Sequence, residues 1–327
     1  YGNVGTCCGG TGMENHTKYQ DSIYFRSADD SKLYVNLYVP STLDWREKGI
    51  TVEQVTKFPY EGTSTLTIRG NGKLAVSMRV PSWVRRGYTV KVNDVAQKIV
   101  AAPGTYVTID RQWKTGDKID IAMPMSFRAE GAIDDASVQS IYYGPTLLTV
   151  QAPPLVQATQ GQAGGSAAAA APNQTPAAQA AVAAASLEAG LIKFSLYKHF
   201  KLNGDFAAAM VPVVGKPLHF TFNGQTLAPL FVSDPQSGQT QPFHMYVRRH
   251  EPTIVFGSVD TGIANAKRDD GKTLLDAVWG SAPFASHKVF MTAVERTANE
   301  WRAAGKLTAA EQANVVKAAK GAAKELA

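Results

Sequence analysis

The chain has 327 residues, of which 44% are hydrophobic and 18% are charged, and its formal net charge at pH 7 is +6. This length and composition allow more than one globular domain and exclude a wholly disordered chain. Basic residues are scattered among acidic ones and form no long run, so nucleic acid is not an expected partner. No stretch approaches the roughly 20 continuous apolar residues that cross a bilayer, so no membrane span is expected.

Residues 1–27 predict a loop followed by one helix. Thr11 and Glu14 have the spacing of a capping box, which predicts a helix that begins at Gly12 and runs toward Phe25. One helix alone has little to pack against, so we expect it to be the remnant of a larger helical domain. The chain also begins at Tyr1 rather than Met, and we expect its natural beginning to lie upstream.

Residues 28–151 predict a domain of short strands. Six runs alternate apolar and polar residues or are rich in β-branched residues, and Gly- and Asn-containing turns separate them. Many short strands at this spacing indicate an antiparallel β-sandwich. The six runs are 33–39, 64–68, 73–80, 89–92, 106–109 and 118–123.

The second half of the chain predicts a linker and a further domain. Residues 152–187 are dominated by Ala, Gln, Gly and Pro, which supply too little large apolar surface to fold alone. Residues 188–327 predict a β-rich domain that ends in helices, so the expected fold class is mainly β with one amino-terminal helix and a helical carboxyl terminus. The expected strands are 218–222, 243–247 and 253–256, and the expected helices are 286–304 and 308–326, with a break at Gly305.

The segment Thr6-Cys-Cys-Gly-Gly-Thr-Gly-Met-Glu-Asn-His-Thr-Lys-Tyr19 carries the clearest chemistry. Cys7 and Cys8 are the two cysteines of the chain, and a disulfide between neighbours needs a strained ring. They lie just before the predicted helix, whose positive dipole end favours a thiolate. Zinc ligation, a nucleophilic thiolate and inert buried thiols all stay open, and two sulfurs cannot complete a tetrahedral zinc site.

This motif resembles the end of the catalytic domain in glycoside hydrolase families 127 and 146, the β-L-arabinofuranosidases. The resemblance continues through Asp21-Ser-Ile-Tyr-Phe25 and Leu33-Tyr-Val-Asn-Leu-Tyr-Val-Pro-Ser41, and the segments 251–260, 268–270 and 282–287 resemble the tail domain of many relatives. It implies that residues 1–27 are the carboxyl-terminal edge of an (α/α)6 barrel and that residues 28–151 are the β-sandwich domain that follows it.

The resemblance also implies a retaining reaction, in which a zinc-bound cysteine attacks the anomeric carbon and forms a thioglycosyl intermediate. By motif, Cys7 would be the nucleophile and a Zn²⁺ ligand, Cys8 would be a second Zn²⁺ ligand, and Asn15 or His16 would face the sugar. In the family, a further Glu and Cys ligand and the acid/base Glu lie upstream of this motif, so the chain alone is expected to show little or no hydrolysis. The implied substrate is a plant cell-wall oligosaccharide or glycoside, and the implied location is secreted or periplasmic.

Several other polar and aromatic residues have simpler interpretations. His244 and His250 are six apart on an expected strand beside Arg248 and Arg249, which indicates one solvated face. We expect Glu14 to cap its helix, His287 to serve local structure, Trp45, Trp83 and Trp113 to pack in the sandwich, and Asp260, Asp269 and Asp270 to make turns rather than a calcium loop.

Two other functions stay open. The β-regions would suit a carbohydrate-binding module without a catalytic role, which would bind sugar even without residues 1–27. They would also suit a structural sandwich that only joins neighbouring domains, which would neither bind sugar nor depend on the cysteines.

Overall fold

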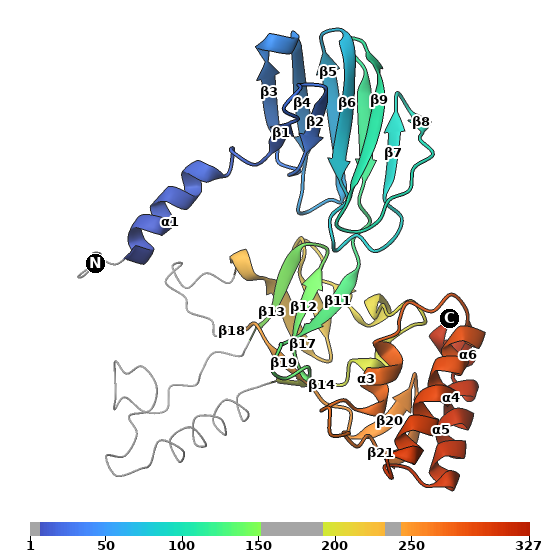
Figure 1. Cartoon of the computed structure of the whole chain (residues 1–327). Helices are drawn as coiled ribbons and strands as arrows, with labels where there is room; N and C mark the ends of the chain where they lie inside the picture. The colour runs from blue at the N-terminus through green and yellow to red at the C-terminus, as the bar shows by residue number, and fades with distance from the viewer. Residues whose placement is uncertain (1–6, 152–191, 233–242) are drawn as a thin grey trace, which may run out of the picture. The chain divides into compact units, whose positions relative to one another are not determined.

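A computed structural model describes the backbone of residues 7–151, 192–232 and 243–327. The chain divides into two compact units, Tyr1–Ser126 and Phe127–Ala327, and each is described by itself. Figure 1 labels their helices and strands.

The first unit contains helix α1 (Cys7–Lys18) and a sandwich of two β-sheets. The smaller sheet has the order β1 (Tyr24–Arg26), β2 (Lys32–Val35), β6 (Gly72–Arg79) and β9 (Tyr106–Trp113). The larger sheet has the order β3 (Ser41–Trp45), β4 (Ile50–Thr56), β5 (Thr63–Arg69), β10 (Lys118–Ala122), β7 (Thr89–Val92) and β8 (Val95–Ala96), with the 3-10 turn η1 (Arg46–Lys48) between β3 and β4. The predicted β-sandwich is therefore confirmed, although β2 and β6 pair in parallel.

Alternating apolar residues build the core between these two sheets. Strand β5 alternates buried and less buried residues along its length, and its partner β10 does the same, so each strand turns one apolar row inward. Both rows join one apolar cluster with residues of β2, β6 and β9. Trp113 is fully buried in this cluster, and its indole N–H donates to the Leu74 carbonyl over 2.7 Å.

The second unit begins with a sheet in the order β14, β19, β12, β13, β17, β16, β15, to which β11 adds beside β12 and β18 beside β13. The strands are β11 (Phe127–Gly131), β12 (Val138–Tyr143), β13 (Thr146–Gln151), β14 (Ile192–Phe194), β15 (Val211–Pro212), β16 (Phe220–Phe222), β17 (Gln225–Pro229), β18 (Phe243–His244) and β19 (Val247–Arg249). Three 3-10 turns accompany them: η2 (Tyr197–His199), η3 (Ala207–Ala209) and η4 (Leu230–Val232).

The rest of this unit is a hairpin covered by helices. It comprises β20 (Thr253–Phe256), β21 (Val259–Ala264), α3 (Leu274–Trp279), α4 (His287–Ala303), α5 (Ala309–Gly321) and α6 (Ala323–Leu326). Figure 1 shows α4 and α5 running alongside each other, and the hairpin and all four helices share one apolar core. The two predicted carboxyl-terminal helices are confirmed, and the chain breaks between them at Gly305, which has φ of 68°.

The amino-terminal helix differs from the prediction. Helix α1 begins at Cys7 and ends at Lys18, so Thr11 lies inside the helix and cannot be its amino-terminal cap. Residues 24–26 are not helical, because they pair with β2 as an antiparallel strand. The cysteines are therefore the first two residues of the helix rather than the residues just before it.

The boundary between the two units also differs from the predicted boundary at residue 151. Strands β11 to β13 belong to the second unit, because β12 pairs with β19 and β13 pairs with β17. The predicted linker, 152–187, lies outside the described residues. The run 243–247 is not one strand, since β18 pairs with β13 whereas β19 pairs with β12.

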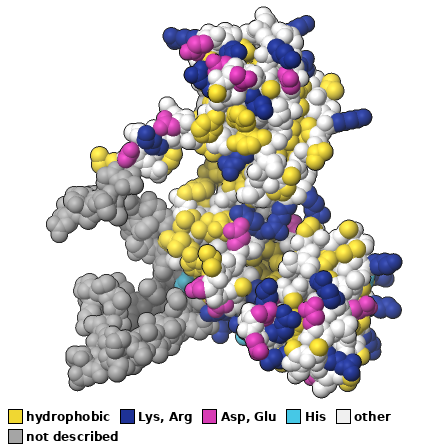
Figure 2. All heavy atoms as spheres, viewed as in Figure 1, with side chains coloured by type: hydrophobic (Ala, Val, Ile, Leu, Met, Phe, Trp, Pro, Cys, Tyr) yellow, Lys and Arg dark blue, Asp and Glu magenta, His cyan; other side chains and the backbone are white. Residues whose placement is uncertain are grey.

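Charged side chains are mixed on the surface. On the face that Figure 2 presents, basic and acidic side chains are interspersed over both units. None of the helices among the described residues has the length and apolarity needed to cross a membrane.

Candidate functional site

Cys7 and Cys8 occupy the first turn of α1. The backbone amides of a helix's first turn have no partner within the helix, and the helix dipole favours negative charge there. The structure gives only the backbone at these two residues and at His16, so the side chains of Cys7, Cys8 and His16 lie outside its description. Their predicted contacts with zinc or sugar therefore stay predictions.

The other residues predicted near this site lie on the exposed surface of α1. The Asn15 side-chain amide donates to the Tyr19 hydroxyl over 3.2 Å, and both side chains are exposed. Glu14 is also exposed, and its backbone carbonyl accepts from the Thr17 hydroxyl over 2.7 Å. The structure thus leaves Asn15 accessible to a ligand without joining it to a pocket.

A zinc site would fit the chemistry of the two cysteines. Thiolates are preferred zinc ligands, and a tetrahedral site needs four donors, of which Cys7 and Cys8 would supply two. Among the residues whose side chains the structure describes, no group of three His, Cys, Asp or Glu is placed to hold a metal. The described side chains therefore do not complete the donor set.

The second unit contains a buried network of charged residues that the sequence analysis missed. The Arg249 side chain is only 6% exposed, and it forms ion pairs with Asp276 of α3 and, at 3.4 Å, with Glu251. Its guanidinium also donates to the Tyr197 hydroxyl over 3.0 Å, and that hydroxyl lies 3.0 Å from Asp276. The predicted solvated face was therefore wrong for Arg249, because the residue turns inward on the same face of β19 as the buried Val247.

Burial controls the protonation of this network. It raises the pKa of Glu251 to about 7, although the Tyr197 amide and the charge of Arg249 lower it. The Tyr197 amide donates to that carboxylate over 2.8 Å. Burial also raises the pKa of the Tyr197 hydroxyl well above its usual range, so the hydroxyl stays protonated and can donate to Asp276.

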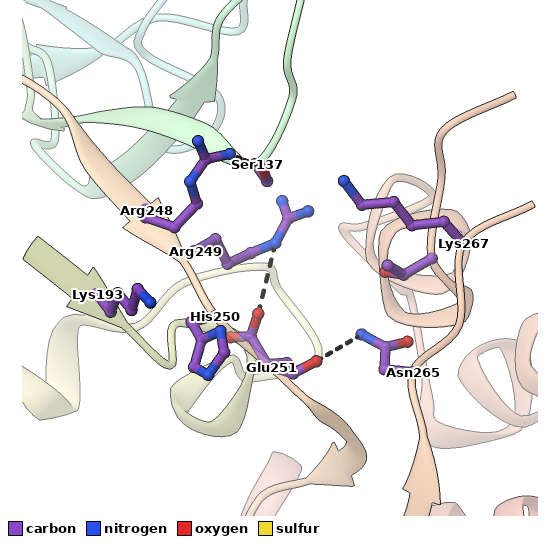
Figure 3. Close-up of a pocket in the computed structure, with 9 residues that line it drawn as sticks. Ser137, Lys193, Arg248, Arg249, His250, Glu251, Asn265 and Lys267 are labelled. Atoms are coloured by element: carbon purple, nitrogen blue, oxygen red, sulfur yellow. Dashed lines mark hydrogen bonds and ion pairs between the residues drawn. The ribbon is translucent and has the colours of Figure 1, made fainter. Parts of the chain in front are cut away.

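A polar cleft of about 430 Å³ opens over this network. Figure 3 shows the side chains that line it, with Glu251 bonded to Arg249 on one side and to Asn265 on the other. Arg248 pairs with Asp135 and Ser137, each at 2.5 Å. We call this site the cationic cleft; its lining residues are Ser137, Lys193, Arg248, Arg249, His250, Glu251, Asn265, Lys267 and Thr273.

Asp135, beside the cleft, stays ionised. Burial alone would raise the pKa of Asp135, but hydrogen bonds from Ser137 and Arg248 outweigh burial and hold that pKa well below the usual range. His250 lies in the cleft, whereas His244 lies on β18, so the two histidines do not share one strand as predicted.

The tryptophans of the first unit pack as predicted. Trp45 and Trp113 are buried in the sandwich core, and Trp83 packs against that core with its ring 6.0 Å from the ring of Phe58.

The three aspartates of the tail and His287 serve local structure. Asp260 accepts from Thr253 and from the Gly262 amide, Asp270 pairs with Arg268, and Asp269 lies in a turn. His287 begins α4, with its ring 5.7 Å from that of Phe290.

Comparison with known proteins gives one family match. Residues 32–125, which span β2 to β10, match the family model described as "Beta-L-arabinofuranosidase, GH127 middle domain". A search of curated proteins found no match.

Solved structures match this chain in part. A protein titled "Glycoside hydrolase" is 24% identical over 45% of this chain, with a TM-score of 0.41. A GH127 β-L-arabinofuranosidase from Geobacillus stearothermophilus T6 is 25% identical over 44% of this chain, with a TM-score of 0.40. A third, titled as a GH127 β-arabinofuranosidase, is 26% identical over 39%, with a TM-score of 0.35.

The structural matches cover only part of this chain and only part of each solved chain. This chain spans 26%, 24% and 24% of the lengths of those three solved chains. The family assignment therefore rests on the model match over the sandwich: residues 32–125 match the middle domain of glycoside hydrolase family 127, and the chain is GH127-like.

Proposed function

We propose that this chain is part of a retaining glycoside hydrolase that acts on β-L-arabinofuranosides or related plant-wall sugars, with Cys7 as its nucleophile. The observation that carries the proposal is the family match over 32–125, which follows closely after the paired cysteines of α1. Two of the matched solved proteins are described as arabinofuranosidases of family GH127, one as a β-L-arabinofuranosidase and the other as a β-arabinofuranosidase. A plant-wall substrate further implies a secreted or periplasmic protein.

The position of Cys7 suits a thiolate. Cys7 is in the first turn of α1, where the positive end of the helix dipole would stabilise a thiolate. A bound Zn²⁺, held by Cys7 and Cys8 together with donors from elsewhere, would keep the sulfur ionised and ease its later departure. Asn15 or His16, on the same helix, would contact the sugar hydroxyls.

The reaction would proceed in two displacements. The Cys7 sulfur would attack the anomeric carbon, forming a C–S bond as the glycosidic C–O bond breaks, and an acid group would protonate the leaving oxygen. Water would then add to the same carbon, displace the sulfur and lose a proton to the same group. Two inversions give net retention, with a thiolate in the place of the usual carboxylate nucleophile.

The test is hydrolysis of a chromogenic β-L-arabinofuranoside by the protein from the whole reading frame that contains this chain. We expect Cys7→Ser to lower the rate by about 1000-fold or more, because the nucleophile is lost. We expect Cys8→Ser to lower bound zinc as well as rate. Val100→Ala, at a side chain 94% exposed in the sandwich, is the control and should change neither. Full activity in Cys7→Ser would remove this residue from catalysis.

A carbohydrate-binding role without catalysis is the second candidate. One observation favours a version of it that, unlike the module expected from the sequence, needs residues 24–26: a pocket of about 310 Å³ at the sandwich edge, between the edge strands β1 and β3, combines aromatic and acidic side chains. Phe25 there is 47% exposed, beside Asp44 and Glu47. If this role holds, Phe25→Ala should weaken binding of arabinan oligosaccharides by about tenfold, whereas Cys7→Ser should leave binding unchanged. Equal binding of these oligosaccharides by Phe25→Ala and the unaltered chain would exclude this pocket as the sugar-binding site.

A further inference from the structure

The cationic cleft of the second unit gathers positive charge around an open space. Four of its lining residues are Lys or Arg, and Glu251 is its one acidic lining residue. Both arginines are engaged: Arg249 with Glu251 and Asp276, and Arg248 with Asp135. Among the residues that the structure describes, these pairs occupy the carboxylates of Glu251, Asp276 and Asp135.

The two lysines differ from the arginines. Among the residues that the structure describes, no carboxylate lies within ion-pair distance of Lys193 or Lys267. Both lysine side chains are exposed at the cleft, as is the side chain of His250. The groups with spare hydrogen-bonding capacity here are therefore mainly donors, and two of them carry full positive charge.

The orientation of Lys267 adds to this excess of positively charged donors in the cleft. Figure 3 shows its side chain extending across the opening toward the side where Ser137 and the two arginines lie. Like charges that face one another across a partly shielded space repel, and an anion between them converts the repulsion into attraction. The Glu251 carboxylate does not fill this role, because it accepts from the Tyr197 amide and pairs with Arg249 below the opening.

We propose that the cationic cleft binds the oxyanion group of a small ligand, with Lys267 as its direct contact and Lys193 adding positive charge to the cleft. The cleft's volume of about 430 Å³ lies within the range of small-molecule sites, about 300–1,000 Å³, and admits a ligand the size of a monosaccharide. The shared chemistry is a group with several anionic oxygens, which either the carboxylate of a sugar acid or a phosphate supplies. This site is independent of Cys7 and of glycoside hydrolysis.

Titration calorimetry on the full chain tests the proposal with three probes: D-galacturonate, inorganic phosphate and neutral L-arabinose. We expect at least one anion to bind, to bind more weakly as salt concentration rises, and to lose about tenfold in affinity in Lys267→Gln. Tighter binding of galacturonate than of phosphate would assign a sugar acid, and the reverse order a phosphate.

Controls separate a lost contact from a lost fold. Lys306→Gln changes an exposed lysine away from the cleft and should bind as the unaltered chain does, while Lys267→Arg should retain most of the affinity. Three outcomes would overturn the proposal: neither anion binds, Lys267→Gln binds as tightly as the unaltered chain, or L-arabinose binds as tightly as the tighter of the two anions.

Discussion

Arg249 has two buried carboxylate partners, so its removal should be unusually costly. Arg249→Met would leave Glu251 and Asp276 without their cation in a site where their side chains are 2% and 11% exposed. Leaving a buried charge unpaired costs about 3–5 kcal/mol. We expect chemical denaturation to show a loss of unfolding free energy of that order.

A matched surface pair provides the comparison for this loss. Arg46 pairs with Asp44 at 2.8 Å, but the two side chains are 87% and 53% exposed. Arg46→Met should cost less than about 1 kcal/mol, because water screens the pair. If Arg249→Met cost no more than Arg46→Met, the buried network would have no structural role.

The protonation of Glu251 predicts a pH dependence of stability. Its pKa rises from an ordinary 4.5 to about 7 on folding, so between these pH values the unfolded chain loses this proton while the folded chain keeps it. The unfolding free energy should therefore fall as pH rises from about 4.5 to about 7, by about 1–3 kcal/mol. The charged and titratable groups that face this carboxyl are Arg249, Asp276 and Tyr197.

Glu251→Gln tests that dependence. Because glutamine does not titrate, this variant should lose most of the decline in unfolding free energy between these pH values, measured by urea denaturation at several pH values. Glu295→Gln, an exposed glutamate on α4, should keep the decline. A decline that survives in Glu251→Gln would assign the proton to another group.

The sequence pointed to the cysteine motif but not to the buried charged network around Arg249. The paired cysteines are conspicuous as neighbours in a glycine-rich segment, and their motif carried the family resemblance before any fold was known. Arg249 was missed, because adjacent arginines suggest a solvated face. The alternation of Val247 and Arg249 was the available signal, since residues two apart on a strand share a face.

At the scale of elements, helix caps give a quantitative prediction. Thr308 accepts from the Glu311 amide, and the Glu311 side chain accepts from the Thr308 amide, which completes a capping box for α5. Thr308→Ala should therefore lower the unfolding free energy by about 1 kcal/mol in a thermal or urea melt. Thr292→Ala, inside α4 and exposed, should change it by less than half as much. Equal effects would show that the cap does not stabilise α5.

The elements found from the sequence are those with local signals. The helices after Ser286 and Thr308 were predictable because each has a capping residue and a run of helix formers. Helix α3 was missed, although Thr273 and Asp276 have capping-box spacing. The extent of α1 was not predictable, because the segment after Lys18 is drawn into an antiparallel pair with β2, a contact that local propensity does not encode.

At the scale of the whole molecule, strand pairing sets the boundary between the units. Composition changes at residue 152, so the sequence favoured a boundary there. The pairs that β12 and β13 form with β19 and β17 move it to residue 126, because pairing between distant segments leaves no local mark.

This boundary can be tested by expressing shortened chains. Residues 28–126 retain every buried residue of the sandwich core cluster and lose only the edge strand β1, so they should unfold cooperatively. Residues 28–151 add β11 to β13 without their partners, exposing buried residues such as Leu148 and Val150, so they should be less soluble and more readily proteolysed. Greater protease resistance of residues 28–151 would restore the boundary predicted from sequence.

If Cys7 is the nucleophile, its sulfur must form a covalent bond to the sugar during turnover. The most direct test is peptide mass spectrometry of the protein from the whole reading frame, quenched in acid during turnover of a slow β-L-arabinofuranoside. We expect a pentosyl adduct on Cys7, with no adduct in Cys7→Ser. An adduct on a carboxylate, or turnover with inversion and no adduct, would contradict it.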